Sequence, residues 1–238
     1  MTDEYSDWEY EEPISLPLIG DEAPEFEAQT TNGHVKFPAD YKGKWVILFS
    51  HPADFTPVCT TEFIAFASMQ DEFTKLNTEL IGLSIDSIFA HVAWLKEIHD
   101  NIRYTDREGK VHENVEVKFP VIADIKMDVA KKYGMLQPGA SDTKAVRAVF
   151  IINPSGIVKA ILYYPLSAGR NMAEIKRLLQ ALQLNEKEGV ATPANWMPGD
   201  DVIIGAPETF AGAQERSCQA KAEGTTLHSW FLMTKKQK

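Results

Sequence analysis

The feature that most limits the fold is a short apolar run followed by a proline-containing loop and a helix start. Residues 45–49 read W-V-I-L-F, a run that is too short for a buried helix and rich in residues that favour strands. The loop after it contains Pro52 and Pro57, and Pro57 suits the first turn of a helix because its missing N–H costs nothing there. We therefore predict a central strand over residues 45–50 and a helix over residues 57–76.

This arrangement places Cys59 in the first turn of the predicted helix. Thr56 stands just before Pro57 and is a natural N-cap residue. Unpaired N–H groups and the positive end of the helix dipole favour a thiolate over a thiol, and the thiolate is the nucleophilic form of cysteine. Because Thr56 and Cys59 are three residues apart, the hydroxyl can bond to the sulfur or hold a substrate oxygen beside it. The alternative is a buried structural cysteine behind an ordinary Thr-Pro turn.

The stretch H-P-A-D-F-T-P-V-C-T-T-E at residues 51–62 closely resembles the peroxidatic motif of peroxiredoxins, in particular of the one-cysteine branch. Further motifs that look like this branch follow in the same order, and together they cover most of the chain. They are I-G-L-S-I-D-S at 81–87, F-P-V-I-A-D at 119–124, R-A-V-F-I-I at 147–152, L-Y-Y-P-L-S-A-G-R-N at 162–171 and A-T-P-A-N-W at 191–196.

The resemblance implies an α/β protein with a thioredoxin-like fold, in which helices flank a mixed central sheet and a C-terminal dimerisation arm follows. The periodicity of the chain agrees with this order of elements. We predict a hairpin around Asn32-Gly33, further strands at 80–85, 121–123, 147–152 and 158–164, and further helices at 88–98, 129–133 and 171–184. His91 and His99 are expected on the solvent side of the helix over 88–98.

Three parts of the chain are expected. Residues 1–15 are acidic and should form a flexible N-terminal arm. Residues 16–184 should form the thioredoxin-like peroxidase domain. Residues 185–238 should form a C-terminal arm or small domain with an irregular path, because their pattern shows little periodicity.

Composition excludes several classes of function. A formal net charge of -10 in 238 residues argues against nucleic-acid binding and against docking on anionic membranes. No apolar run approaches the ~18 residues of a membrane span, and the amino terminus lacks a signal-peptide pattern, so we expect a cytoplasmic protein. Two cysteines are too few for a disulfide scaffold. We predict no cofactor and no metal site, although histidines distant in sequence can meet in space.

The resemblance implies the chemistry as well as the fold. Cys59 would attack the terminal oxygen of a peroxide and become a sulfenic acid. The chain has 24 lysines and arginines, and the resemblance points to Arg147 as the cation that stabilises the developing negative charge. Without the resemblance, Arg147 would be read as a surface residue of an edge strand. Thr56 and the first-turn N–H groups would supply hydrogen-bond donors.

Four further residues are expected to support the site. His51 would form a hydrogen bond near Cys59, although it could equally be a packed loop histidine. Pro52 would shield the sulfur from water. Glu62 would anchor the network around the catalytic arginine, and Arg170 looks like the second arginine of the family.

The second cysteine, Cys218, leaves the regeneration of the enzyme open. Relatives with a resolving cysteine in this arm place it close to an aromatic pair, whereas Cys218 lies twelve residues before Trp230. Either Cys218 resolves Cys59, within or between chains, or an external thiol must do so. The implied partners are peroxide substrates and a thiol reductant such as thioredoxin or glutaredoxin with glutathione. The implied assembly is a homodimer, or a ring of dimers.

Two other functions are possible on this fold besides a peroxidase. Animal one-cysteine peroxiredoxins also carry a phospholipase site built from serine, histidine and aspartate. The corresponding positions hold Lys44, Pro38 and Ser155, so we exclude a lipid hydrolase. The remaining alternative is a redox-regulated chaperone or a peroxide sensor on the same fold.

Overall fold

The computed structural model describes residues 16–141, 143–218 and 224–237. These residues form two units, the first ending at Arg170 and the second beginning at Asn171. Our predicted boundary lies after residue 184. In the structure, the helix that follows Arg170 belongs to the second unit rather than to the first. The predicted flexible arm over residues 1–15 lies outside the described residues.

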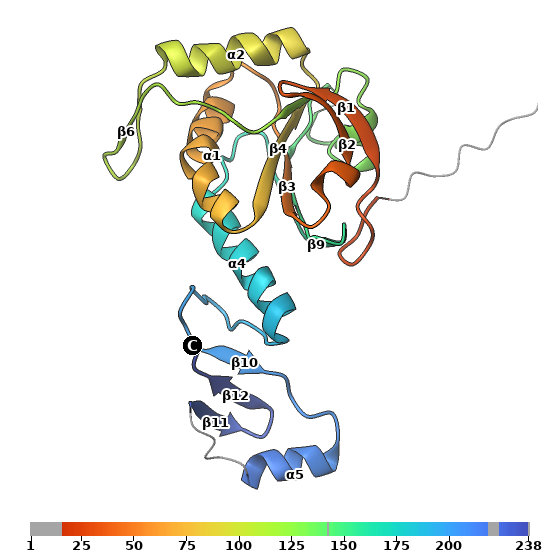
Figure 1. The fold of residues 1–238 in the computed structure, drawn as a ribbon, viewed down its shortest axis with the longest axis vertical. Helices are drawn as coiled ribbons and strands as arrows, with labels where there is room; N and C mark the ends of the chain where they lie inside the picture. The colour runs from red at the N-terminus through yellow and green to blue at the C-terminus, as the bar shows by residue number, and fades with distance from the viewer. Residues whose placement is uncertain (1–15, 142, 219–223, 238) are drawn as a thin grey trace, which may run out of the picture. The chain divides into compact units, whose positions relative to one another are not determined.

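A mixed seven-stranded sheet forms the centre of the first unit (Figure 1). Its strands run in the spatial order β2-β1-β7-β4-β3-β8-β9. Strands β3, β4 and β7 are parallel, and the other neighbours are antiparallel. The prediction of a mixed central sheet is confirmed. The strands are β1 (Phe26–Thr30), β2 (Gly33–Phe37), β3 (Trp45–Ser50), β4 (Thr78–Ser84), β7 (Val121–Ala123), β8 (Arg147–Ile152) and β9 (Val158–Tyr164).

The neighbouring strands β3 and β8 are completely buried. All six residues of β3 and all six residues of β8 are buried, in keeping with sequences that are apolar apart from Ser50 and Arg147. Because β8 runs antiparallel to β3, with Phe49 opposite Val149, the first residue of β8 lies at the carboxyl end of β3. That end of β3 leads directly into the loop before Cys59.

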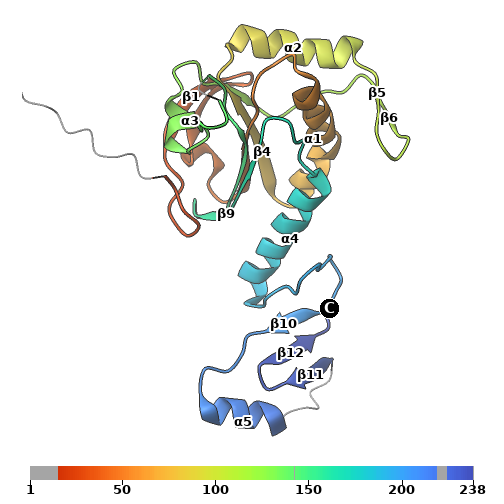
Figure 2. The same ribbon diagram turned by 180° about the vertical axis from the view of Figure 1, so that it is seen from behind.

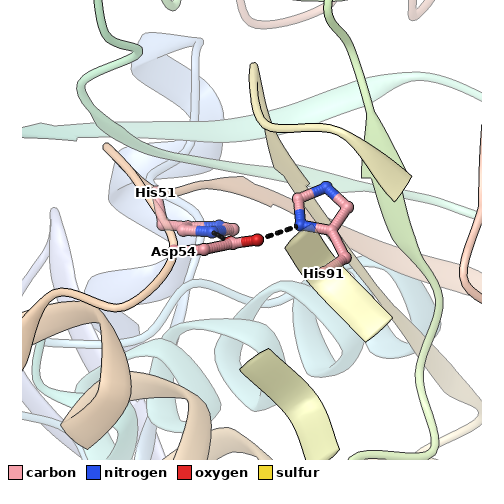
Figure 3. Close-up of side chains that lie close together, drawn as sticks. All are labelled: His51, Asp54 and His91. Atoms are coloured by element: carbon pink, nitrogen blue, oxygen red, sulfur yellow. Dashed lines mark hydrogen bonds and ion pairs between the residues drawn. The ribbon is translucent and has the colours of Figure 1, made fainter. Parts of the chain in front are cut away.

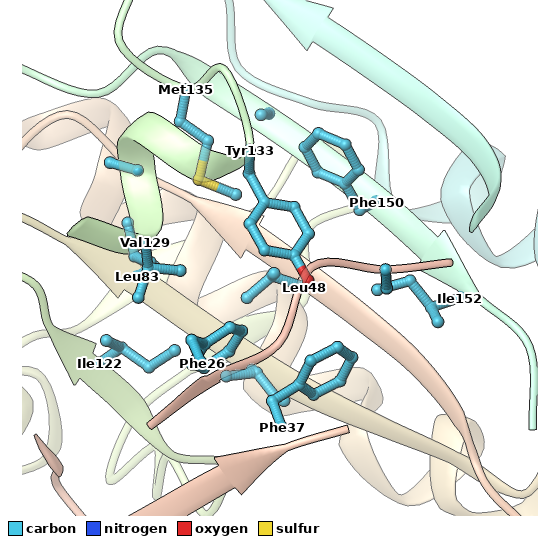
Figure 4. Packing of buried hydrophobic residues seen from close by; sticks show 14 of the residues in the cluster. Phe26, Phe37, Leu48, Leu83, Ile122, Val129, Tyr133, Met135, Phe150 and Ile152 are labelled. Carbon is cyan, nitrogen blue, oxygen red and sulfur yellow. The ribbon is translucent and has the colours of Figure 1, made fainter. Parts of the chain in front are cut away.

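The helices of this unit pack on both faces of the sheet (Figures 1 and 2). Successive strand residues point to opposite faces. On one face, Phe49 packs against Phe63 and Phe66 of helix α1, with ring centroids 5.7 and 4.2 Å apart. On the other face, Leu48 joins a buried cluster with Tyr133, just after α3 (Figure 4). The helices are α1 (Pro57–Lys75), α2 (Ile88–Asn101), α3 (Asp128–Lys132) and the short 3-10 helix η1 (Ala39–Tyr41).

Local signals place most of these elements correctly. The hairpin of β1 and β2 turns at Thr31-Asn32, and the Gly33 that begins β2 has a φ of +106°. Two predicted elements are longer than expected, since β4 begins two residues earlier and α2 ends three residues later. The segment between α2 and β7 contains a two-stranded hairpin of β5 (Tyr104–Thr105) and β6 (Val111–His112). No helix in the described part of the chain combines the length and apolar character of a membrane span.

The second unit is more regular than we predicted. Helix α4 (Met172–Glu188) starts at Asn171, whose side chain accepts from two first-turn N–H groups. A three-stranded sheet follows in the order β10-β12-β11, and helix α5 (Phe210–Cys218) lies between its first two strands in sequence. The prediction of an irregular path is therefore wrong. The strands β10 (Val202–Ile204), β11 (Thr225–Ser229) and β12 (Leu232–Lys235) are too short to give a periodic signal.

Replacing Gly82 by alanine should destabilise the fold. A Cβ at Gly82 would lie 3.3 Å from a ring carbon of Phe63 and 3.4 Å from one of Phe49. These rings pack against each other and cannot withdraw easily, so we expect a loss of about 1–3 kcal/mol in the free energy of unfolding. Denaturant titration measures this loss. The control Gly139→Ala, whose Cβ meets nothing within 4 Å, should change stability by less than about 0.5 kcal/mol. Equal effects of the two substitutions would contradict the prediction.

Candidate active site

Cys59 lies in the first turn of α1, and its side chain is fully buried. Pro57 occupies the start of the helix and Thr56 the N-cap position, as predicted. The Thr56 hydroxyl makes no capping hydrogen bond to the helix, and it donates to the Ala53 carbonyl at 2.8 Å. The first-turn N–H groups around Cys59 therefore have no cap from Thr56. What the Thr56 hydroxyl offers to a bound molecule is its acceptor lone pairs.

The structure places Arg147 against the sulfur. The Nη1 atom of Arg147 lies 3.4 Å from the Cys59 Sγ, within hydrogen-bond distance for sulfur. The other side of the guanidinium is fixed, since Nε and Nη2 both donate to the Leu166 carbonyl at 3.0 and 2.8 Å. Arg147 is buried, and its position follows from the antiparallel pairing of β8 with β3. A fixed guanidinium at this distance stabilises a thiolate.

Glu62 holds two arginines at once. It follows Cys59 by three residues on α1 and so lies on the same helix face. Its Oε2 accepts from Arg147 Nη1 at 2.7 Å and from Arg170 Nη2 at 2.6 Å. Its Oε1 accepts from the Nε and the backbone N–H of Arg170, both at 2.9 Å. Burial acts to raise the pKa of Glu62, but the two arginines outweigh it and hold the pKa below its ordinary value.

Arg170 ties this carboxylate to the strands. Its Nη1 donates to the Ser50 carbonyl at the end of β3 and to the Ala148 carbonyl in β8, both at 3.0 Å. Its guanidinium carbon also lies 5.2 Å from the centroid of the Phe49 ring, a cation–π contact. Two buried guanidiniums face one carboxylate, so this set of residues carries a surplus positive charge beside Cys59. A thiolate at Cys59 balances that surplus.

His51 binds an aspartate rather than the cysteine. Its Nε2 lies 2.9 Å from Asp54 Oδ1, and Asp54 Oδ2 lies 2.7 Å from His91 Nδ1 (Figure 3). His91 Nε2 continues the chain of contacts to the Ile122 carbonyl at 3.0 Å. The remaining ring nitrogen of His51, Nδ1, is buried and has no hydrogen-bond partner. The His51 ring packs on Phe63, one helical turn after Cys59, with centroids 4.8 Å apart.

Burial and hydrogen bonding set the charges of this group in opposite directions. Burial lowers the pKa of His51, and the hydrogen bond with Asp54 opposes this shift without cancelling it. Burial acts to raise the pKa of Asp54, but the hydrogen bonds with His51 and His91 outweigh it, so the pKa of Asp54 lies below its ordinary value. His51 is therefore neutral and Asp54 is a carboxylate at neutral pH.

The expectation that His91 lies on the solvent side of α2 is wrong. His91 is fully buried, whereas His99 is exposed as predicted. The buried residues of α2 are His91, Trp94 and Ile98, which recur at steps of three and four. This stripe is visible in the sequence and would have placed His91 inside. Asp54 was missed because nothing local marks it as the partner of two histidines.

The remaining predicted positions can be located in part. Pro52 is buried in the loop between β3 and α1. Cys218 is the last residue of α5, but its side chain lies outside what the structure describes. Pro38, Lys44 and Ser155 line one cavity of about 220 Å³. The described residues around this cavity include neither a histidine nor a carboxylate.

These contacts define a class of protein. A thioredoxin-like domain holds a buried cysteine at a helix start, with a guanidinium against its sulfur, and this is the arrangement of a thiol peroxidase. The AhpC/TSA family model matches residues 19–161, and the model of the C-terminal domain of 1-Cys peroxiredoxin matches residues 181–219. The chain belongs to the peroxiredoxin family and reduces hydroperoxides at the expense of thiols through a buried cysteine.

Individual relatives agree with this family over nearly their whole length. A peroxiredoxin of Methanosarcina mazei is 63% identical over 221 residues, which cover 93% of this chain and 98% of the relative. A peroxiredoxin of Aquifex aeolicus is 49% identical over 235 residues, covering 94% and 99%. The solved structure of the yeast mitochondrial 1-Cys peroxiredoxin matches with a TM-score of 0.75 and 38% identity, covering 93% of this chain and 100% of that one. The predictions of the family and of the fold class are confirmed.

Replacing Glu62 by glutamine should expose how much the fold depends on the buried pair of arginines. The substitution leaves two buried guanidiniums without their carboxylate, so we expect a loss of about 3–5 kcal/mol in the free energy of unfolding. The folded-state pKa of Glu62 is lowered, so its contribution is complete above its ordinary value of 4.5 and is lost as the pH falls through the lowered pKa. Denaturant titrations from neutral to acidic pH should show this loss in the wild type only.

The matched control for Glu62 is Glu174, which binds Arg177 with both carboxylate oxygens at 2.6 and 2.8 Å but is partly exposed. Glu174→Gln should cost at most about 1 kcal/mol, since solvent screens an exposed pair. A Glu62 variant as stable as the Glu174 variant would contradict the role given to the buried carboxylate.

Proposed function

We propose that Cys59 is the peroxidatic residue and that Arg147 is its catalytic cation. The observation that carries this assignment is the 3.4 Å contact between Arg147 Nη1 and the buried Cys59 sulfur. The thiolate attacks the terminal oxygen of a hydroperoxide, so an S–O bond forms as the O–O bond breaks. The alkoxide or hydroxide leaves and takes up a proton, and Cys59 becomes a sulfenic acid.

The neighbouring groups act on the two oxygens of the substrate. Arg147 stabilises the negative charge that develops on the leaving oxygen, and the first-turn N–H groups of α1 add donors. Thr56 accepts a hydrogen bond from the hydroperoxide O–H, because its own hydrogen is engaged with Ala53. Glu62 and Arg170 position Arg147 rather than touch the substrate. Pro52 keeps water from the sulfur.

Access to the sulfur requires movement, because Cys59 is fully buried. The loop before α1 is the segment best suited to open. Phe55 in this loop is exposed and has a φ of +55°, an unfavourable conformation for a residue with a large side chain. Opening of this loop would admit a peroxide and later a thiol that is too large to enter the closed site.

An external thiol then reduces the sulfenic acid and regenerates the Cys59 thiol. Two thiol groups reduce one sulfenic acid to the thiol, with release of one disulfide and one water molecule. Thiol resolution in the yeast mitochondrial 1-Cys peroxiredoxin proceeds through glutathione and thioredoxin systems, and we propose the same class of reductant here. Because the cycle consumes reduced thiols, it suits a reducing compartment such as the cytoplasm.

We also propose that the chain acts as a homodimer, which could assemble further into a ring of dimers. The second unit exposes three aromatic side chains, and Phe210 and Trp230 line a cavity of about 490 Å³. Exposed aromatic side chains that lie together are typical of surfaces that bind a partner. The exposed aromatic residues are Phe210, Trp230 and Phe231.

Replacing Arg147 by lysine should slow the first half of the reaction. Lysine keeps a charge but cannot bind Leu166, Glu62 and the sulfur in one plane. We expect the second-order rate constant for hydrogen peroxide, measured by stopped flow, to fall by about 10²–10³-fold. Arg103→Lys, at an exposed arginine, should react like the wild type, and Cys59→Ser should not react. An unchanged rate in the Arg147 variant would contradict the assignment.

Replacing Cys218 by serine tests the source of the second thiol. We expect thioredoxin-dependent or glutathione-dependent turnover to stay unchanged, because an external thiol reaches Cys59 directly. Steady-state peroxide consumption with each reductant measures this. Loss of turnover with an intact first reaction would show instead that Cys218 resolves Cys59.

A further inference from the structure

Three buried side chains outside the arginine network form a continuous polar group. His51, Asp54 and His91 are all nearly or fully buried, and Asp54 lies between the two imidazole rings (Figure 3). The contacts run from His51 Nε2 to Asp54 Oδ1 at 2.9 Å, from Asp54 Oδ2 to His91 Nδ1 at 2.7 Å, and from His91 Nε2 to the Ile122 carbonyl at 3.0 Å. The chemistry described above uses neither Asp54 nor His91.

Counting protons along these contacts fixes the role of each nitrogen. A backbone carbonyl only accepts, so His91 Nε2 must carry a hydrogen. His91 Nδ1 faces a carboxylate oxygen at 2.7 Å, so a second proton must lie between these two atoms. With Asp54 ionised, that proton belongs to His91, whose ring is then an imidazolium. The imidazolium and the carboxylate then cancel each other's charge, which lowers the cost of burying the two groups.

The same count fixes the tautomer of His51. Asp54 as a carboxylate can only accept, so His51 Nε2 donates to it. A neutral ring then has no hydrogen on Nδ1, the atom that is buried without a partner. The opposite tautomer would bury an unpaired N–H, which is rarer and more costly than an unpaired acceptor.

We propose that His91 is a positioning residue, which as an imidazolium paired with Asp54 keeps His51 neutral and its Nδ1 a free acceptor beside the helix that carries Cys59. The proposal rests on the peroxidase function given above. His51 packs on Phe63, one turn after Cys59, so the free acceptor lies against the helix that carries the reacting sulfur. The lowered pKa values of His51 and Asp54 agree with the assigned charges.

The charges around His51 explain why Asp54 must pair with another cation if His51 is to stay neutral. The charged groups that act on His51 are Asp54, His91 and Arg170, and Arg170 disfavours a positive charge on the ring. Asp86 faces the same loop and accepts from the Asp54 backbone N–H at 3.0 Å. Without His91, the carboxylate of Asp54 would have only His51 as a neighbouring ring that could supply a proton. His51 would then become the imidazolium.

The tautomers can be observed directly. We expect solid-state ¹⁵N spectra of the full-length wild type, with labelled histidine, to show one buried imidazolium that disappears in His91→Gln. They should also show one neutral ring protonated at Nε2 that disappears in His51→Gln. A neutral His91, or a His51 protonated at Nδ1, would overturn the proposal. This measurement does not depend on peroxidase activity, so it separates failure of the proposal from failure of the proposed function.

The kinetic test compares two histidines of the same helix. In His91→Gln we expect His51 to take up a proton as the pH falls over about pH 5 to 8, and the rate of Cys59 with hydrogen peroxide to fall about tenfold relative to the wild type at the acidic end. The control His99→Gln, at an exposed histidine, should keep the wild-type pH profile. Asp54→Asn combined with His91→Gln removes both charges and should recover most of the wild-type profile.

Other outcomes would overturn the assignment. A folded His91→Gln variant with the wild-type pH profile would remove His91 from the function, and so would a double variant no better than the single one. The three donor atoms lie within 4.8 Å of one another, close enough to hold a metal ion. If elemental analysis finds one metal ion per chain in the wild type and none in His91→Gln, a metal ion occupies the place assigned to the proton on His91, and the proposal is wrong.

Discussion

The carboxylate of Glu62 joins the segments on which the chemistry depends. It binds Arg147 and Arg170, which follow it by 85 and 108 residues. Removing such charges from water costs several kcal/mol per ion, and the cost is offset only when every charge is paired. Two guanidiniums and one carboxylate leave a positive charge unpaired within this set, and a thiolate at Cys59 completes the balance. The interactions that hold β3, β8 and α1 together therefore also place a positive charge beside the Cys59 sulfur.

The fold could be predicted wherever one short stretch of sequence carries its own signal. The run W-V-I-L-F gives β3, Pro57 gives the start of α1, and Asn32-Gly33 gives the first hairpin. The small sheet of the second unit could not be predicted in this way. Its strands have three to five residues, and their stability depends on pairing between β10 and β12, which lie far apart in the chain.

The candidate site divides in the same manner. The spacing of Cys59 and Glu62 places both on one face of α1, and this follows from helix geometry alone. Arg147 was selected by family resemblance, because no local pattern shows that the start of β8 meets the first turn of α1. His91 lies in a buried stripe that periodicity could have revealed. Its importance nevertheless depends on Asp54, which is 37 residues away and meets it only in the folded chain.

The two buried polar groups around α1 balance their charges differently, and the difference suits the attack of a thiolate on a neutral hydroperoxide. The group of Arg147, Glu62 and Arg170 keeps a surplus positive charge, which in the proposed mechanism stabilises both the thiolate and the departing oxygen anion. The group of His91, Asp54 and His51 is neutral as a whole, so His51 adds no third cation and retains an acceptor nitrogen. A single shared network could not provide both conditions, because a proton placed on His51 would remove the acceptor. Because His91 of α2 neutralises Asp54, His51 can stay neutral while the arginine group keeps its positive charge.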